Sequence, residues 1–397
     1  MNEPTVVVHP TEFPPGPGGI GTHACALAKG LTKHGFQVSV LAPVAKATEA
    51  AMREFGVKEP FRLLTMPCRS PRVLEGALRL RDVVAELRRS RAHKKGTQPA
   101  CLIVSGSQAL WVGCMAAAVT GSPALAVVHG SELDSRVRWE RTLTGLALRS
   151  ADAVVAVSHF TARYLSRFGV SPERVHIIPN GADPAVFGSG EKDREAGRHF
   201  RQRLGLGGGP ILLTVGNVGP RKGQEVIIRA LPEVKRHFPG VMYIMVGLPT
   251  FREEYERLAG ELGVSEHVRF LGVVPTTELI EAYNGADLFV MVSRHTDDGD
   301  FEGFGIAVVE AALCGLPSVV ARNSGLVEAI EENATGVAVE QDDVPGTAAG
   351  IVRLLSDPTR LNEMGAYARQ RALRSQTWPA ITERYAGLIR QLVGAES

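Results

Sequence analysis

The feature that most constrains the fold is a repeated alternation of short apolar runs with longer helical segments. Thr5 to His9 is an apolar run, a helical segment extends over roughly 19–34, and Gln37 to Leu41 is apolar again. The same rhythm restarts at Ile211 to Val215. Strands that alternate with helices at this spacing form parallel, doubly wound sheets. The sequence therefore predicts an α/β protein with two Rossmann-like domains that face a central cleft.

Chain length also favours two domains, because 397 residues are too many for one ordinary hydrophobic core. A polar stretch with several glycines, 188–209, separates the two halves of the pattern, and we place the domain boundary there. The halves differ in charge. Residues 1–190 carry 22 Lys and Arg against 14 Asp and Glu, a net of +8, which leaves −6 for the rest of a chain whose net charge is +2. A basic half can indicate a polyanionic or membrane partner.

The stretch most informative about function runs from Asp297 to Ala321 and reads DDGDFEGFGIAVVEAALCGLPSVVA. An acidic loop with glycines leads into a helical run over 305–313, and a short buried strand follows. The first N–H groups of a helix lack intrahelical partners, and the helix dipole is positive at that end. An anion, most plausibly a phosphate, therefore fits at the start of this helix.

Five residues of this stretch are candidates for binding a phosphate ester. The amides of Phe304, Gly305 and Ile306 lie at the start of the helix, and Gly305 lets a ligand approach the backbone closely. Glu302 lies just outside the helix and Glu310 about a turn and a half inside it. One carboxylate can face the reacting end of a ligand while the other meets a hydroxyl-rich part. From spacing alone, the alternative is that Glu302 merely caps the helix and Glu310 is a solvated charge on its surface.

The loop after the first strand contains the pattern G-x-G-x-x-G at Gly16, Gly18 and Gly21, which is typical of dinucleotide-binding dehydrogenases. This loop is long and rich in proline, however, and the second strand ends without an acid that could bind a ribose hydroxyl. A dehydrogenase is therefore a distant alternative. The backbone of Gly18 and Gly19 can still approach a phosphate or its attached sugar, with a flexible turn as the competing interpretation.

Two further positions have the chemistry of a ligand site. Arg221 and Lys222 lie in the loop GNVGPRKG at the start of a helix, where basic residues oppose the helix dipole and so favour a role on phosphates. His129 comes just after the apolar run Leu125 to Val128. Ligands of open α/β sheets bind at that end of the strands, although a lone histidine is more often structural.

A basic segment and the cysteine content indicate the partners and the compartment. The helical run 79–95 is rich in arginine and lysine, which predicts either contact with an anionic inner membrane or simply a solvated helix face. The five cysteines are scattered without a C-x-x-C pair, and no signal peptide or membrane-spanning run is visible. We therefore expect a cytoplasmic protein, peripheral on the membrane if the basic run binds lipid, with no nucleic-acid partner.

Glu302, the intervening GFGIAVV and Glu310 closely resemble the E-x7-E element of the retaining glycosyltransferases of family 4. Other segments resemble the same family in the right order, namely the glycine loop with Gly18 and Gly19, the VHG with His129, the PNGAD turn and GNVGPRKG. The resemblance covers nearly the whole chain. It implies the GT-B fold and transfer of a sugar from a nucleotide-sugar, such as a UDP- or GDP-sugar, to a glycan or lipid-linked acceptor in cell-surface polysaccharide or glycolipid synthesis.

The resemblance also implies how the work is divided between the domains. The acceptor binds mainly to the N-terminal domain, 1–188, and the donor mainly to the C-terminal domain, 189–376. A last helix that begins at Trp378 crosses back, so that 377–397 pack on the N-terminal domain. Enzymes of this kind neutralise phosphate with side chains and helix ends, so the resemblance implies no cofactor and no metal.

The cluster Asp297, Asp298 and Asp300 is the one place where the sequence raises a metal site, because three neighbouring carboxylates can hold Mg²⁺. In view of the resemblance, we instead expect this acidic loop to lie near the sugar or the acceptor.

A set of site residues follows from the resemblance. Lys222 grips the donor diphosphate, Glu310 the ribose, and the backbone near Val274 the base, while Glu302 lies beside the donor sugar and His129 hydrogen-bonds it. The donor-binding residues implied are Gly18, Gly19, Arg221, Lys222, Val274, Phe304, Gly305, Ile306 and Glu310, and the catalytic residues are Glu302 and His129.

The sequence departs from the family at Asn217, where an arginine usually follows the glycine that is Gly216 here. Arg221 is a candidate for supplying the missing charge from beside Lys222, and a weaker grip on the phosphate is the alternative. The sequence identifies no carboxylate nucleophile for a double displacement, so we favour same-face attack in which the departing diphosphate helps to deprotonate the acceptor. A sugar-nucleotide epimerase of the same architecture and a non-catalytic nucleotide-sugar binding protein are the alternative functions.

Overall fold

The computed structural model describes residues 4–16, 18–44, 48–67, 72–92, 100–130, 132–133, 137–188, 191–296 and 299–394. The chain divides into two compact units. Unit 1 consists of Met1–Asn180 together with Trp378–Ser397, and unit 2 consists of Gly181–Thr377. The last helix therefore belongs to the same unit as the first strand.

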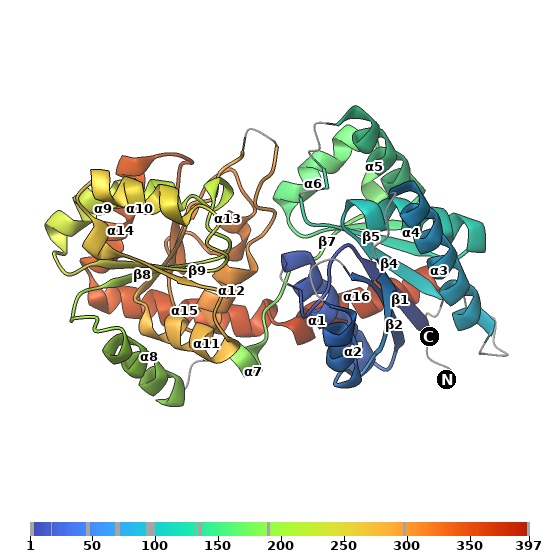
Figure 1. The fold of residues 1–397 in the computed structure, drawn as a ribbon, viewed down its shortest axis with the longest axis horizontal. Helices are drawn as coiled ribbons and strands as arrows, with labels where there is room; N and C mark the ends of the chain where they lie inside the picture. Colours follow the sequence, from blue (N-terminus) through green and yellow to red (C-terminus); the bar gives the residue numbers. More distant parts are fainter. Residues whose placement is uncertain are drawn as a thin grey trace. The chain divides into compact units, whose positions relative to one another are not determined.

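Unit 1, over its described residues, is built on a seven-stranded parallel sheet in the order β3-β2-β1-β4-β5-β6-β7. Its strands are β1 (Thr5–Pro10), β2 (Gln37–Val44), β3 (Arg62–Pro67), β4 (Cys101–Ser105), β5 (Ala124–Val128), β6 (Ala153–Ala156) and β7 (Val175–Ile177). Its helices are α1 (Gly19–Lys33), α2 (Glu49–Val57), α3 (Arg72–Ala92), α4 (Ser107–Thr120), α5 (Arg138–Ser150), α6 (His159–Leu165) and α16 (Trp378–Leu392). Helices α3, α4 and α5 pack side by side on one face of the sheet, and α1 packs with α16 on the other (Figure 1).

Unit 2 has, within the part of the chain that the structure describes, a six-stranded parallel sheet in the order β10-β9-β8-β11-β12-β13. Its strands are β8 (Ile211–Val215), β9 (Met242–Val246), β10 (Val268–Gly272), β11 (Leu288–Met291), β12 (Ser318–Ala321) and β13 (Gly336–Val339). Its helices are α7 (Pro184–Phe187), α8 (Glu191–Arg203), α9 (Gln224–His237), α10 (Arg252–Glu261), α11 (Thr276–Gly285), α12 (Ile306–Leu313), α13 (Leu326–Ala329), α14 (Val344–Leu355) and α15 (Pro358–Ser375). Helix α9 packs against α10 and α14 on one face, whereas α8 packs with α11, and α12 with α15, on the other (Figure 1).

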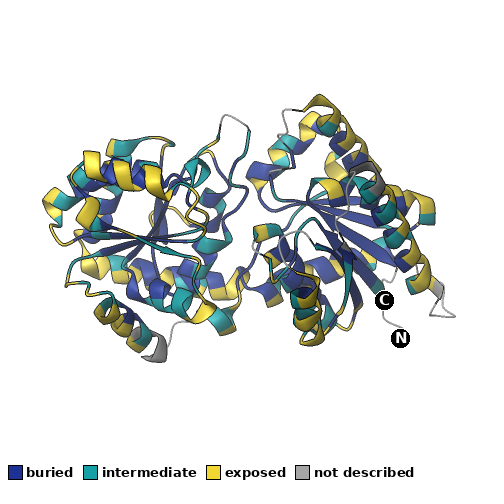
Figure 2. Ribbon diagram, in the orientation of Figure 1, coloured by how far each residue is buried: buried dark blue, intermediate teal, exposed yellow. Residues whose placement is uncertain are grey.

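Both sheets are doubly wound, as the alternation of strands and helices predicted. The strands are buried on both faces by helices, and the helices expose their outer sides (Figure 2). Strands β4 and β5 are buried at every position, which explains why both are apolar throughout except for Ser105 at the end of β4. The predicted fold class, two Rossmann-like domains, is confirmed.

Each sheet has one point at which the strand order reverses direction. In unit 1 the chain returns to pair β4 beside β1, and in unit 2 it returns to pair β11 beside β8. The loops that leave neighbouring strands at such a point diverge to opposite faces of the sheet and leave a crevice at the carboxyl ends of the strands. The candidate residues Lys222 and Glu302 lie on the loops that follow β8 and β11, so the topology brings them to the same crevice.

Candidate functional site

Two cations and one carboxylate meet at this crevice of unit 2. A 3-10 turn after β8, Pro220–Lys222, carries Arg221 and Lys222, and the loop between β11 and α12 carries Glu302. Nζ of Lys222 donates to Oε2 of Glu302 at 2.5 Å, and Nη1 of Arg221 donates to the same oxygen at 2.6 Å. Nε of Arg221 also pairs with Asp300 at 2.9 Å. With Asp300, two carboxylates therefore balance the two cations.

The carboxylate of Glu302 is ionised in this cluster. Burial by itself would raise the pKa of Glu302, but Lys222 and Arg221 outweigh it and hold the pKa at about 2 instead of the usual 4.5. Burial lowers the pKa of Lys222 below its ordinary value, and the charge of Glu302 opposes that effect. The same charge is the main cause that raises the pKa of Arg221. These cations are partly desolvated, so an anion that reaches them is attracted more strongly than it would be in water.

Glycines leave the floor of the crevice without side chains. Gly216 follows β8 with a φ of 146°, and a Cβ there would lie 3.0 Å from Cε of Lys222. Gly247 follows β9 with a φ of 143°, and a Cβ there would lie 2.2 Å from the carbonyl oxygen of Gly216. At each of these two positions, the positive φ and the close contact together favour glycine over any residue that has a Cβ. Bare backbone therefore lies next to Lys222, which suits close approach of a phosphate ester.

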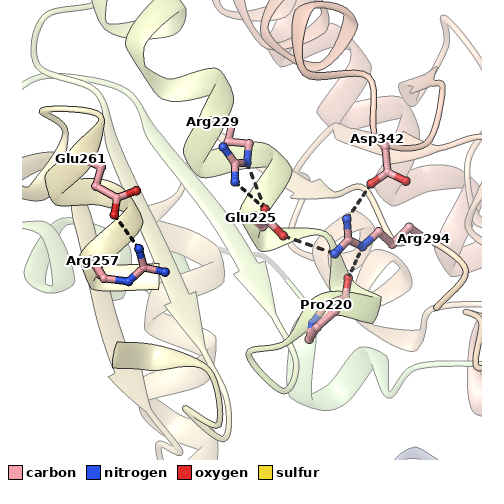
Figure 3. Close-up of polar contacts among 7 residues, drawn as sticks. All are labelled: Pro220, Glu225, Arg229, Arg257, Glu261, Arg294 and Asp342. Atoms are coloured by element: carbon pink, nitrogen blue, oxygen red, sulfur yellow. Dashed lines mark hydrogen bonds and ion pairs between the residues drawn. The ribbon is translucent and has the colours of Figure 1, made fainter. Parts of the chain in front are cut away.

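Arg294 holds the turn that carries the two cations (Figure 3). Its Nε donates to the carbonyl oxygen of Pro220 at 3.2 Å, and its backbone N–H donates to the carbonyl oxygen of Arg221 at 2.9 Å. Its guanidinium pairs with Asp342 at 2.9 Å and with Glu225 at 3.3 Å. Arg294 was not predicted from the sequence, where the only signal for it is a position just beyond the carboxyl end of a buried strand.

Helix α12 begins at the same crevice. Its N-terminal cap, Gly305, has a left-handed φ of 86°, and a Cβ there would meet Cδ2 of Leu326 at 2.3 Å. Among the described residues no side chain caps the first turn of α12. No side chain therefore competes with a ligand for the amides of Phe304, Gly305 and Ile306, which is the arrangement that favours an anion at a helix start.

Glu310, on α12, is the second carboxylate of the site. Its Oε2 accepts a hydrogen bond of 2.7 Å from the hydroxyl of Tyr283. Burial raises the pKa of Glu310 to about 6, although Tyr283 and the charge of Lys222 act in the opposite direction. Because the charge of Lys222 lowers the pKa of both Glu302 and Glu310, these three predicted side chains lie in one region of unit 2. Tyr283 was not identified from the sequence.

Two loops complete the description of unit 2. Strand β10 ends at Gly272, with a φ of 71°, and Val273 and Val274 follow it. Val273 is 67% exposed, which is unusual for an apolar side chain beside a sheet edge. Asp297 and Asp298 lie outside the described residues. Among the residues that are described, no group of three His, Cys, Asp or Glu side chains is placed to hold a metal ion.

The glycine loop of unit 1 leads directly into α1. Gly18 caps this helix with a φ of 145°, and a Cβ on it would lie 1.8 Å from Oε1 of Glu12, so any side chain would displace that carboxylate. A Cβ on Gly19 would meet no atom within 4 Å. The backbone at Gly19 is therefore open to a ligand, while Gly18 is required to accommodate Glu12, a residue that the sequence analysis did not single out.

His129 follows β5 at the carboxyl edge of the sheet of unit 1, as predicted. The backbone N–H groups of His129 and Gly130 donate to Oε2 of Glu132 at 3.0 and 2.9 Å, which fixes the turn. Nε2 of His129 is buried and has no hydrogen-bond partner among the described residues. Burial lowers the pKa of His129 to about 4, with Glu12 opposing, so the ring is neutral near pH 7. A buried nitrogen without a partner is the feature expected of a group that hydrogen-bonds a ligand.

Behind His129 lies a cluster of aromatic residues that includes the last helix. The ring of His23, on α1, meets that of His129 edge-on with centroids 4.8 Å apart. His23 also packs on Trp378, and its Nε2 lies 3.2 Å from the hydroxyl oxygen of Tyr385. The start of α16, where the chain re-enters unit 1, is thereby connected to His129 through His23. The sequence showed no signal for this cluster.

The basic run predicted at 79–95 falls on α3, and residues 93–99 lie outside the described ones. Arg79 is buried and donates to Gln108 at 3.1 Å, and Arg81 pairs with Asp82 at 2.7 Å. Arg88 and Arg89 are exposed. Part of this run is therefore engaged in contacts within unit 1. Among the described residues, no helix is both long enough and apolar enough to cross a membrane.

Comparison with known proteins assigns the chain to a family. The model described as "Glycosyltransferase Family 4" matches residues 17–186, and the model described as "Glycosyl transferases group 1" matches residues 198–371. A GDP-mannose-dependent alpha-(1-6)-phosphatidylinositol monomannoside mannosyltransferase of Mycolicibacterium smegmatis is 32% identical over 386 residues, which cover 95% of this chain and 96% of that protein. The Mycobacterium tuberculosis protein of the same name is 29% identical over 392 residues, with coverage of 97% and 98%.

Solved structures agree on the fold. The crystal structure of Anabaena Alr3699/HepE in complex with UDP and glucose matches with a TM-score of 0.80 and 20% identity, over 97% of this chain and all of that one. Together with the two doubly wound sheets, these matches define a glycosyltransferase of the GT-B fold. The chain belongs to glycosyltransferase family 4. The predicted family, fold and enzyme class are thus confirmed, and the transfer of a sugar from a nucleotide-sugar donor is the activity of this chain.

Proposed function

We propose that this chain is a retaining mannosyltransferase that moves mannose from GDP-mannose to a phosphatidylinositol-based glycolipid on the cytoplasmic face of a membrane. The observation that supports the donor and acceptor is the identity of 29–32% with mannosyltransferases of that name over 95–97% of this chain. The observation that supports the chemistry is the cluster in which Lys222 and Arg221 share one oxygen of Glu302.

Unit 2 supplies the groups that a nucleoside diphosphate needs. The diphosphate lies on the amides of Phe304, Gly305 and Ile306 and against the ammonium of Lys222, with Arg221 in place of the arginine usual at position 217. Glu310, held by Tyr283, accepts hydrogen bonds from the ribose hydroxyls. The backbone beside Val274 holds the base. These groups also stabilise the charge that develops on the diphosphate as its bond to the sugar breaks.

Unit 1 supplies the acceptor site and further contacts to the donor. The backbone of Gly18 and Gly19, open at Gly19, approaches the diphosphate or its sugar, and Nε2 of His129 hydrogen-bonds a hydroxyl of the donor sugar. Because its pKa is about 4, His129 takes part in its neutral form near pH 7. We assign acceptor binding to 1–188 with 377–397, and donor binding to 189–376.

Retention of configuration requires attack from the face that the diphosphate leaves. The acceptor hydroxyl attacks the anomeric carbon, its proton passes to the departing diphosphate oxygen, and Glu302 stabilises the positive charge that develops on the sugar. No metal ion enters this scheme, since the two cations and the start of α12 neutralise the diphosphate. A double displacement would instead require a carboxylate placed as nucleophile against the sugar.

The test begins with nucleotide preference. GDP at about a hundred times its Kd should stabilise the protein by about 2.7 kcal/mol, and therefore raise Tm by about 5–10 °C in a domain of this size. UDP and ADP at the same concentration should do so less. Incubation with GDP-mannose and phosphatidylinositol monomannoside should then yield a dimannoside, and the anomeric coupling in its NMR spectrum should report the α linkage.

Each outcome separates one part of the proposal from the others. Stabilisation by UDP but not by GDP would remove GDP-mannose as the donor and leave the glycosyltransferase assignment intact. Consumption of GDP-mannose at the same rate with and without a lipid acceptor would instead indicate hydrolysis or epimerisation, and would overturn the proposed transfer. A β-linked product would exclude retention.

A further inference from the structure

An arginine cluster surrounds a surface cavity of about 430 Å³ in unit 1. The residues that line it are Arg138, Arg141, Thr142, Gly145, Arg149, Arg167 and Phe168. None of the four arginines forms an ion pair with a carboxylate of the described residues. Nη1 of Arg149 donates to the carbonyl oxygen of Phe168 at 2.7 Å, which holds one guanidinium at the cavity. Four neighbouring positive charges repel one another, so the cavity is suited to an anion.

Several arginines on other helices are neutralised by a glutamate one turn away, as in Arg252 with Glu256 at 2.7 Å and Arg257 with Glu261 at 2.5 Å (Figure 3 shows the second pair). Helix α5 has arginines at its start and in its last turn, but no such pair is found on it among the described residues.

An apolar stripe runs along α5 next to the arginine cluster. Trp139, Leu143 and Leu146 are 39–58% exposed and are spaced by four and three residues, so they share one side of the helix. On a helical wheel, at 100° per residue, this side begins within a quarter turn of the side that bears Arg138 and Arg149. The solvent-facing surface of α5 therefore carries both the apolar stripe and the basic cluster, side by side.

Helix α4 extends the apolar surface. The ring of Trp111 on α4 contacts that of Trp139 on α5 at a tilt of 58°, with centroids 5.6 Å apart, and Nε1 of Trp111 donates to the hydroxyl of Thr144 at 3.0 Å. Both helices follow neighbouring parallel strands, so they run in the same direction. Met115 and Val119, one and two turns beyond Trp111 and both more than half exposed, therefore lie beside the stripe of α5.

The clustering is far from random. Six of the eleven large apolar side chains that are exposed among the described residues lie on α4, on α5 or at the start of α5. Isolated apolar residues are normal on a protein surface, whereas a contiguous patch indicates a binding surface. We refer to Met115, Val119, Trp139, Leu143, Leu146 and the four arginines together as the α4–α5 face.

We propose that the α4–α5 face docks on an anionic lipid bilayer. A membrane surface has a layer of phosphates above the acyl chains. The α4–α5 face matches it, because apolar side chains that include a tryptophan lie next to arginines that line a cavity. The arginine cavity takes a lipid phosphate, and the stripe enters the interface between headgroups and acyl chains. The bilayer supplies both the apolar and the anionic partner that the face lacks.

The main competing occupant is a second copy of this chain. A two-fold symmetric contact places the same patch on both sides of the interface, so a dimer formed through this face would bring two arginine clusters together. Charge therefore disfavours self-association and favours an anionic surface. The proposal does not depend on the donor site, because it uses no residue of the glycosyl-transfer machinery.

The test is flotation with lipid vesicles of phosphatidylcholine alone or of an equal mixture of phosphatidylcholine and phosphatidylglycerol. The whole protein should float with the mixed vesicles and much less with the neutral ones, and high salt should weaken the binding. The double variant Arg138→Gln with Arg141→Gln lacks two basic residues. Its partition onto the mixed vesicles should be about thirty-fold weaker, equivalent to about 1 kcal/mol for each residue. Trp139→Ser with Leu146→Ser should weaken it by a similar factor or more.

A matched control removes the same charge elsewhere. Arg88→Gln with Arg89→Gln takes two exposed arginines from the basic run of α3 and should leave flotation unchanged. Val57→Ser, at an exposed apolar position on α2, controls for loss of apolar surface. All variants should retain the thermal stabilisation by GDP, which shows that they are folded and separates failure of this proposal from failure of the donor assignment.

The outcomes decide between the occupants. Equal flotation with both kinds of vesicle, or wild-type binding by the Arg138 and Arg141 double variant, overturns the proposal. Loss of flotation in the α3 control alone would move the membrane contact to α3 and also overturns it. A dimer in analytical ultracentrifugation that Leu146→Ser dissolves, without binding to vesicles, would assign the face to self-association instead.

Discussion

Replacement of Glu302 with glutamine tests the cation cluster most directly. The substitution keeps the size of the side chain and one acceptor oxygen, but it removes the charge that Lys222 and Arg221 share at 2.5 and 2.6 Å. Asp300 then remains as the carboxylate paired with Arg221. We expect the stability of the ligand-free protein and its affinity for GDP to change in opposite directions.

The ligand-free variant should be less stable than the wild type. The difference between a pKa of about 2 for Glu302 and the usual 4.5 is equivalent to roughly 3 kcal/mol. Because the folded state has the lower pKa, this stabilisation is complete above about pH 4.5 and is lost as the pH falls towards 2. At neutral pH, about 3 kcal/mol lowers Tm by roughly 6–12 °C in a domain of this size. The difference in Tm between the two proteins should therefore shrink below about pH 4.5.

Nucleotide affinity should increase in the same variant. A diphosphate on Lys222 lies roughly 6 Å from the Glu302 carboxylate, where two like charges repel by about 3 kcal/mol at an effective dielectric constant of about 20. Screening reduces the repulsion to roughly 1–3 kcal/mol, which predicts GDP binding that is tighter by about five- to a hundred-fold. Sugar transfer should be at least about a hundred-fold slower, because the charge that stabilises the sugar cation is absent.

Isothermal titration calorimetry with GDP and thermal unfolding without ligand measure the two effects. The control is Glu261→Gln, which removes an exposed carboxylate paired with Arg257 at 2.5 Å on α10 (Figure 3). The control should leave GDP affinity and turnover unchanged. Weaker GDP binding by the Glu302 variant, together with an unchanged Tm, would refute the assignment of this cluster to the diphosphate.

Four further tests address neighbouring features. Burial raises the pKa of Glu310 to about 6, so the ionised carboxylate destabilises the folded state as the pH rises from about 4.5 to 6. In urea unfolding, the Glu310→Gln variant should therefore be about 1–2 kcal/mol more stable than the wild type at pH 8 and equally stable near pH 4. The same variant should bind GDP more weakly. Arg294→Met frees the Pro220 carbonyl and should raise KM for the donor about ten-fold with little change in kcat, measured in steady-state kinetics. Tyr385→Phe removes the hydrogen bond to His23 and should lower kcat several-fold while GDP affinity, measured by calorimetry, stays constant. Activity should persist in excess EDTA, and a loss that Mg²⁺ restores would contradict metal-independent transfer.

The buried strands were the most predictable part of the fold. Ile211–Val215 has the same bounds in the structure as in the sequence analysis, because a strand covered on both faces reads as an almost continuous apolar run. The strand Arg62–Pro67, at the edge of the sheet of unit 1, and the helix Glu49–Val57 were not identified. An edge strand is less completely buried, so its sequence mixes polar and apolar residues and has no distinct signature.

The candidate site divides in the same way. Glu302, Lys222 and their neighbours could be predicted because each lies in a short segment whose local spacing already indicates a phosphate site. Arg294 contacts Pro220 across 74 positions, and His23 contacts Tyr385 across 362. Contacts of that sequence separation are produced by the topology of the sheet and the return of the last helix, and no local pattern encodes them. Arg294, His23 and Tyr385 were therefore missed, whereas the candidate residues that lie in short local patterns were identified.

The cation cluster links ligand binding to the state of Glu302. Without a ligand, Glu302 provides the counter-charge that lets Lys222 remain protonated in a partly desolvated place, where an unpaired ammonium would be unfavourable. If Lys222 binds the donor diphosphate, the diphosphate takes over this role, and the carboxylate of Glu302 is released next to the sugar whose bond is to break. In the mechanism that we propose, Glu302 competes after transfer with the product diphosphate for the same cations and so favours its departure. The same carboxylate would then stabilise the empty enzyme and the sugar cation, so its removal should strengthen GDP binding and slow turnover together.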